Sequence, residues 1–257
     1  MCIAAIVRAA ALTALLGLAG CASTSVEYDR MTGTAFPPDQ TVGGKTVTIS
    51  SIYATQGYIV TVATDETNIA ALTGPANPMD PDQYDYITES ELDTLETGHR
   101  SSPVDKTSWI CWDKGIVPTY CTEYHIYGIV VNHYSEDDTG ARDKGIMGLM
   151  WTTDNRRAFT NYYKNSTVSG DGGKYLRSAA HEIGHAFNLH HPDGNGSTDI
   201  MNQTWVVDGI YVYEFLAAAS TDHLKSHDVA CRWPGQSVFG ALHTGHADHG
   251  ITTVSCP

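Results

Sequence analysis

Residues 181–191 read H-E-I-G-H-A-F-N-L-H-H, and this segment constrains the chain more than any other. An α-helix advances about 100° per residue, so His181 and His185 would lie within about 40° of each other and one turn apart. Two imidazoles placed in this way can hold one zinc ion from one face of the helix, with Glu182 beside them as a general base. The motif therefore predicts a metal site on a helix, although the same short pattern also arises by chance.

A third ligand would require the chain to reverse direction after this helix. On a straight helix His191 would lie about 15 Å further along the axis than His181, and well around the cylinder. Asn188 stands where the helix would have to end, and asparagine enters the left-handed conformation more cheaply than most other non-glycine residues. A turn at Asn188 can return either His191 or its neighbour His190 to the metal, and the residues alone leave both open.

A second motif, Asp199-Ile200-Met201-Asn202, follows a run of turn-forming residues. Together the two motifs resemble the metzincin superfamily of zinc endopeptidases, whose pattern is H-E-x-x-H-x-x-G-x-x-H followed by a methionine-containing turn beneath the metal. The resemblance assigns the following roles: zinc ligands His181, His185 and His191, general base Glu182, and Met-turn residue Met201. It implies one catalytic zinc ion.

This chain departs from the family pattern at Asn188, where the family has glycine. The family spacing selects His191 rather than His190 as the third ligand. Gln203 stands two residues after Met201, where the astacin-like and serralysin-like branches carry a tyrosine ligand. We therefore expect that fifth ligand to be absent.

The resemblance implies that the protein hydrolyses peptide bonds in a peptide or protein substrate. Three neutral histidines leave one zinc position for water, whose pKa the metal lowers, and Glu182 would accept the water proton and pass it to the leaving amine. Two other functions stay open: a non-catalytic binding lipoprotein with a zinc-stabilised fold, and a surface scaffold or adhesin in which the motif is accidental. The intact Glu182 argues against the first, because a purely structural site needs no base.

The family also implies an α+β fold, in which a twisted mixed β-sheet with the active-site helix precedes a smaller C-terminal subdomain with the Met-turn and a C-terminal helix. We expect this catalytic domain over residues 43–257, with subdomains 43–191 and 192–257. Residue patterns predict strands over 45–51, 58–63 and 126–133, a hairpin over 109–121, and a strand pair made of 145–151 and 158–163. They also predict helices over 174–187 and 222–232, and a helix over 88–98 that the capping box Thr88-x-x-Glu91 opens. By resemblance, either 145–151 or 158–163 is the edge strand that accepts the substrate backbone.

The amino terminus has the pattern of an export signal. An apolar run over residues 3–18 precedes Leu18-Ala19-Gly20-Cys21, which resembles the bacterial lipobox. We therefore expect a lipoprotein signal peptide over 1–20, a lipid on Cys21 that anchors the protein to the bacterial envelope, by resemblance its outer membrane, and a polar tether over 21–42. A transmembrane anchor or an ordinary cleaved signal is the alternative.

Charge and cysteine content agree with export. The net charge of −14 argues against nucleic acid as a partner. Four cysteines remain after Cys2 and Cys21, and an even number in an exported chain suggests two disulfides. Three pairings are possible, and nearness in sequence favours Cys111 with Cys121 and Cys231 with Cys256. A metal site built from cysteines lacks a close C-x-x-C pair, and the oligomeric state is left open.

Overall fold

A strand near the amino terminus lies inside the main sheet. The computed structural model describes residues 23–70, 86–101, 105–113, 117–135, 142–143, 146–152, 156–165, 167–189, 191, 199–202 and 213. Strand β1 (Ser23–Arg30) pairs in parallel with β4 (Ile59–Ala63) on one side and with β7 (Val117–Val131) on the other. Successive side chains of a strand point to opposite faces, so Val26 and Tyr28 share one face of β1. Both are buried, because the sheet is covered on both faces.

The prediction of a polar tether over residues 21–42 is therefore wrong for residues 23–30. Only two apolar side chains, Val26 and Tyr28, mark this strand, and its polar residues give it the composition of a linker. The folded domain begins at or before Ser23, not near residue 43.

The main sheet has six strands in the order β10-β11-β7-β1-β4, and β6 (Asp105–Asp113) pairs with the first half of β7. Strand β11 (Ala158–Tyr162) is parallel to β7, whereas β10 (Gly148–Leu149) pairs antiparallel with β11 and forms an edge. The sheet is thus mixed and mostly parallel, and with its helices it gives the α+β class that was predicted. The expected hairpin over 109–121 and the strand pair within 145–163 are confirmed.

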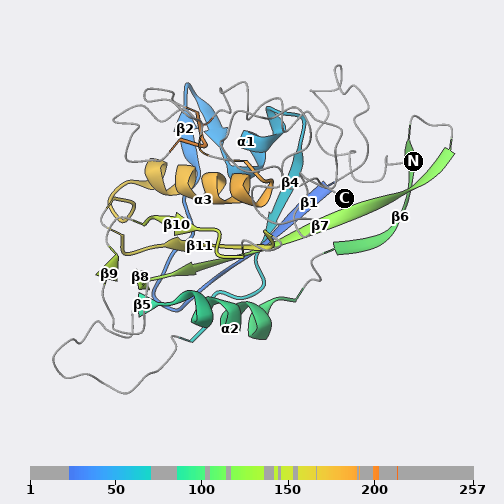
Figure 1. Ribbon diagram of the computed structural model, residues 1–257. Coiled ribbons are helices and arrows are strands. Elements are labelled where there is room, and N and C mark those ends of the chain that lie inside the picture. The colour runs from blue at the N-terminus through green and yellow to red at the C-terminus, as the bar shows by residue number, and fades with distance from the viewer. Residues whose placement is uncertain are drawn as a thin grey trace.

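The helices lie on both faces of this sheet. Helices α1 (Ile49–Ala54) and α3 (Gly172–Ala186) cover one face, and α2 (Glu89–His99) covers the other (Figure 1). Side chains alternate along β7, so that those of even number join the core beneath α1 and α3 while Tyr127, Ile129 and Val131 join the core beneath α2. Burial on both faces explains the continuous apolar composition of this strand.

Local capping signals account for both short helices. Thr88 and Glu91 form the expected capping box at the start of α2, which confirms the helix predicted over 88–98. A second capping box, between Thr48 and Ser51, starts α1. The strand predicted over 45–51 is therefore wrong beyond β3 (Lys45–Val47), because the capping box starts a helix within that alternating stretch.

Two further small sheets complete the described structure. β2 (Gln40–Val42) pairs antiparallel with β3, and β8 (His133–Ser135) lies between β5 (Tyr86–Ile87) and β9 (Arg142–Asp143). They extend the structure beside the main sheet without joining it.

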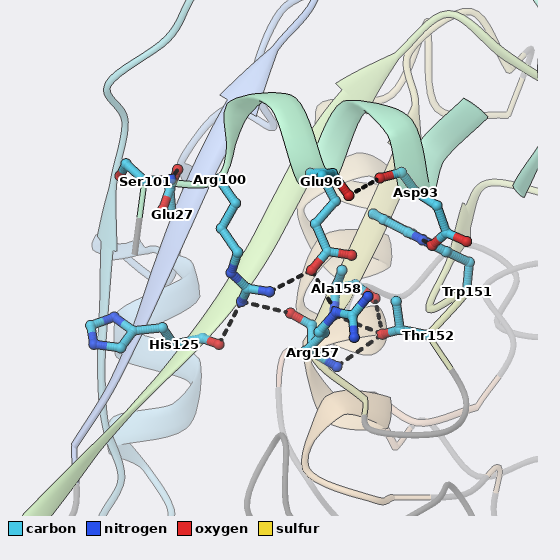
Figure 2. Close-up of polar contacts among 11 residues, drawn as sticks. Glu27, Asp93, Glu96, Arg100, Ser101, His125, Trp151, Thr152, Arg157 and Ala158 are labelled. Carbon is cyan, nitrogen blue, oxygen red and sulfur yellow. Dashed lines mark hydrogen bonds and ion pairs between the residues drawn. The ribbon is translucent and has the colours of Figure 1, made fainter. Parts of the chain in front are cut away.

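Buried charges hold α2 against the sheet. The carboxylate of Glu96 accepts hydrogen bonds from Arg100 at 2.5 Å and from Arg157 at 2.7 Å (Figure 2). Arg100 also donates to the backbone carbonyls of His125 at 2.9 Å and of Arg157 at 3.2 Å. About one turn earlier in the helix, the indole of Trp151 donates to Asp93. These bonds fix the helix at two points along its length.

Several predictions fall on residues outside the described set: the signal peptide, Cys21, Cys231, Cys256, the helix over 222–232 and most of the subdomain over 192–257. Of Cys111 and Cys121, only the backbone in β6 and β7 is described. Among the residues that the structure describes, no helix is both long and apolar enough to cross a membrane.

Candidate metal centre

Helix α3 carries the histidine motif and begins at a defined cap. The side chain of Asp171 accepts hydrogen bonds from the backbone N–H groups of Gly173 and Lys174, at 3.0 and 3.1 Å, which satisfies two of the free donors at the helix start. Its apolar residues face the sheet, and the hydroxyl of Tyr53 in α1 donates to the carbonyl of Ala180 at 2.6 Å. The helix is therefore fixed on the sheet before its histidines begin.

The helix ends where the sequence predicted a turn. Asn188 has φ of 64°, in the left-handed region. The N–H of Asn188 donates to the carbonyl of His185 at 2.8 Å, and the N–H of Leu189 donates to that of Gly184 at 3.0 Å. This pair of nested bonds is a Schellman motif, with asparagine in the position that glycine usually takes. The prediction of a reversal at Asn188 is confirmed.

The reversal returns His191 to the helix. The Nε2 atom of His181 lies 3.0 Å from Nε2 of His191 and 3.0 Å from Nε2 of His185. Ligands in a tetrahedral site with Zn–N bonds of about 2.0–2.1 Å are about 3.3 Å apart. The three imidazoles thus form a group that can hold a metal ion. His190 lies outside the described residues, so the structure places only His191 in this group.

Backbone carbonyls orient two of the three rings. Nδ1 of His181 lies 2.9 Å from the carbonyl oxygen of Ile200, and Nδ1 of His185 lies 2.7 Å from that of Leu189. A carbonyl only accepts, so each Nδ1 carries the proton and each Nε2 presents a lone pair. Two lone pairs 3.0 Å apart repel unless a cation or a proton lies between them. The same arrangement of outer carbonyls is typical of histidine ligands in metal sites.

The pKa shifts of His181 and His191 favour the neutral imidazole that a metal ligand requires. Burial lowers the pKa of His181 well below the ordinary value, and the neighbouring His185 and His191 lower it further. Burial also lowers the pKa of His191, with the Arg177 guanidinium as the second cause. His181 is buried, His185 is half-buried and His191 is exposed, so the group opens to solvent on the side of His191.

Glu182 lies against the edge strand of the sheet. Its side chain is 6% exposed, and the backbone N–H of Met150 donates to it. Burial raises the pKa of Glu182 to about 8, and the bond from Met150 opposes this shift. A Cβ atom at Gly148 would lie 2.9 Å from Oε1 and 2.7 Å from Cγ of Glu182. The carboxyl group of Glu182 therefore fits in this position because residue 148 in β10 is a glycine, which has no side chain.

Met201 lies directly beneath the metal-binding helix. A Cβ atom at Gly184 would lie only 2.3 Å from Sδ of Met201, so the methionine fits because that helix position has no side chain. Asp199 accepts a hydrogen bond from the Met201 N–H at 2.7 Å, and Arg177 donates to the Asp199 carbonyl at 2.6 Å. The turn over 199–202 therefore supplies both the packing under the helix and the carbonyl that orients His181.

Several residues that shape the site were not predicted from the sequence. Gly148 and Met150 reach Glu182 from a strand more than thirty residues earlier, and no local pattern marks that contact. The fully buried guanidinium of Arg156 donates to the carbonyl of Ala186 at 2.8 Å and so caps the end of the metal-binding helix. The backbone of Arg156 has φ of 53°, in the left-handed region, and no sequence pattern predicted this conformation.

No protein-family model matches this chain, and no curated protein matches it. The site therefore rests on its own geometry: a helix, a left-handed turn and three converging imidazoles that can hold a metal ion.

Proposed function

We propose that the protein is a zinc-dependent endopeptidase of the metzincin type. The observation that carries this proposal is the convergence of three imidazole Nε2 atoms beside a buried glutamate, with His181 Nε2 at 3.0 Å from each of its two partners. The left-handed turn at Asn188, where the family's motif has glycine, and the place of Met201 beneath the helix, where the family has its methionine-containing turn, support the metzincin assignment.

Zinc is the metal that this donor set suits best. Three neutral imidazoles in a compact group are typical of catalytic zinc sites, which keep one position for water or substrate. His181, His185 and His191 would hold the ion, and the exposed side of His191 leaves room for a fourth ligand. When bound, zinc lowers the pKa of water and polarises the carbonyl of the bond to be cut.

Glu182 has the position required of the proton carrier. It follows the first ligand on the same helix, and the N–H of Met150 and the backbone of Gly148 confine its carboxylate. In the proposed reaction Glu182 accepts a proton from the attacking water and delivers it to the leaving amine. A purely structural metal site would have no use for a carboxylate buried at this position.

The edge strand β10 is the proposed binding site for the substrate. It is the last strand on its side of the main sheet, and Gly148 within it contacts Glu182. An extended peptide could add to this edge as a further strand, with its backbone hydrogen-bonded to β10 and one peptide bond presented to Glu182. This mode of binding selects polypeptides and uses few side-chain contacts outside the cleft.

Anchoring by a lipid on Cys21 is part of the same proposal and is supported by the lipobox-like tetrapeptide alone. Because β1 begins at Ser23, the lipidated residue would lie two residues before the sheet, a span of at most about 7 Å. Such an enzyme would be held against the membrane surface without a flexible tether. Metabolic labelling with a fatty acid, lost in Cys21→Ser, tests this point.

The decisive experiment compares Glu182→Gln with the wild type in zinc content and in cleavage of a mixed peptide library. We expect Glu182→Gln to keep one zinc ion per chain and to lose cleavage, because the amide cannot accept the proton. Glu89→Gln, an exposed position in α2, is the matched control and should cleave like the wild type. A chelator should abolish cleavage, and added zinc should restore it.

Two results would contradict the proposal. Stoichiometric zinc without cleavage in the wild type would indicate a binding protein with a zinc-stabilised fold. Wild-type protein without zinc would indicate that the motif is accidental.

A further inference from the structure

A second group of metal-ligating side chains lies on the opposite face of the sheet. Glu27 and Asp29 are two residues apart on β1, so both face α2, away from the histidines. Asp65 follows β4, whose last residue, Ala63, pairs with Glu27. Carboxylate oxygens of the three residues all lie within 4.8 Å of one another. They meet at the carboxyl ends of two parallel strands, a usual place for ligands in open sheets.

The most buried of these carboxylates has an unpaired oxygen. Asp29 is fully buried, and its Oδ1 accepts a hydrogen bond from the Glu66 N–H at 3.2 Å. Its Oδ2 has no hydrogen-bond partner outside the cluster among the described residues, and burial, with the adjacent Asp65 carboxyl group, raises the pKa of Asp29 to about 7. An unsatisfied buried polar atom lowers the stability of the folded state, and a charged one lowers it more. The fold therefore places a carboxylate oxygen where it is costly unless something binds it.

The neighbouring strand adds a second unpaired atom to the same place. Tyr127 in β7 is the register partner of Glu27, and its side chain is fully buried on the same face. Its hydroxyl also has no hydrogen-bond partner among the described residues. Burial and then the carboxylates of Asp29 and Glu27 raise the pKa of this hydroxyl, which places it near the cluster.

Nearby positive groups are mainly engaged elsewhere. His99 binds the carboxylate of Glu66 at 2.9 Å. Arg100, the cation whose charge acts on Glu27, directs its side chain towards Glu96 and two backbone carbonyls, whereas Glu27 accepts a hydrogen bond from the Ser101 N–H at 2.7 Å (Figure 2). Among the described residues, neither Asp29 nor Asp65 forms an ion pair with a basic side chain.

We propose that Glu27, Asp29 and Asp65 bind one calcium ion. Donor sets made of oxygen alone select hard cations, and Ca²⁺ takes oxygen ligands at about 2.3–2.6 Å. Two oxygens on one such ion are at most about 5 Å apart, and the three carboxylate oxygens, all within 4.8 Å of one another, satisfy this condition. The ion would neutralise the buried Asp29 and join the end of β1 to the loop after β4. The site is independent of the proposed peptidase activity.

The test measures thermal unfolding of the full chain against calcium concentration. Divalent ions are removed on a chelating resin, one equivalent of zinc is restored, and CaCl2 or MgCl2 is added at equal ionic strength. We expect saturating Ca²⁺ to raise Tm by about 5 °C or more, because ligand that binds only the folded state stabilises it. Mg²⁺ should have a much smaller effect.

Variants locate the effect. Asp29→Asn and Asp65→Asn should lose the calcium-dependent rise in Tm, and Asp65 is exposed, so that variant should fold even if Asp29→Asn does not. The control Asp39→Asn changes an exposed aspartate elsewhere and should keep the full rise. Glu182→Gln should also keep it, which separates this site from the histidine site.

Three results would overturn the proposal. The first is no rise in Tm with calcium. In that case a variant Asp29→Asn that is more stable than the wild type would indicate that Asp29 and Asp65 share a proton instead of an ion. The second is an equal rise with Mg²⁺, which would refute calcium as the ligand. The third is an unchanged rise in both Asp29→Asn and Asp65→Asn.

Discussion

Replacement of Asn188 tests the turn on which the metal site depends. Two variants, Asn188→Gly and Asn188→Ala, both remove the amide, so a comparison between them isolates the backbone conformation. At φ of 64° a residue with a Cβ costs roughly 1–2 kcal/mol more than glycine. The position is buried, so the methyl group of alanine recovers up to about 0.8 kcal/mol. We therefore expect the glycine variant to be more stable than the alanine variant by roughly 0.5–1 kcal/mol.

Thermal unfolding followed by circular dichroism measures this difference, which corresponds to roughly 1–4 °C in Tm for a domain of this size. Ala179→Gly, inside the same helix, is the control: glycine there should be less stable than alanine by about 1 kcal/mol, the opposite sign. Because His191 follows the turn, Asn188→Ala should also bind zinc more weakly than Asn188→Gly. An alanine variant as stable as the glycine variant would refute the left-handed turn and, with it, the return of His191 to the metal.

Three other changes have defined outcomes. His191→Ala should abolish stoichiometric zinc binding, measured by metal analysis after dialysis, whereas His190→Ala should retain it; the reverse result would move the third ligand to the neighbouring position. Gly148→Ala should lower the rate of peptide cleavage at unchanged zinc content, because the new Cβ would lie within 3 Å of Glu182, and an unchanged rate would show that the edge strand does not confine this carboxylate. Tyr53→Phe should lower the free energy of unfolding by about 1 kcal/mol in urea denaturation, because it removes a buried 2.6 Å hydrogen bond to the metal-binding helix. No loss of stability in that variant would mean that the bond has no net effect.

The metal-binding helix and its end could be predicted because their signals are local. His181 and His185 share a helix face by periodicity alone, and the conformational freedom of Asn188 marks the turn. The residues alone left the third imidazole open between His190 and His191, and only the resemblance to the family spacing selected His191. The capping box at Thr88 predicted α2 for the same reason, since a helix start depends on residues within one turn.

Contacts between distant segments could not be predicted in this way. The place of β1 in the sheet depends on its pairing with β7, about a hundred residues later. The polar composition of β1 is that of a linker, so the sequence did not predict a strand there. The contact of Gly148 with Glu182 and the meeting of Asp29 with Asp65 likewise arise from strand order. Nothing in the immediate neighbourhood of these residues specifies which strand will lie beside them.

The central position of β1 has a consequence for how the protein folds. Ser25 pairs with His125, so β1 has no partner on that side until about a hundred further residues have been made. At about 5–20 residues per second this delay lasts roughly 5–20 s. Closing so long a loop also slows folding, since pairings between distant segments must form before the core gains stability. A nascent chain of this protein therefore exposes one unpaired edge of β1 for many seconds, during which a chaperone that covers strand edges would prevent aggregation.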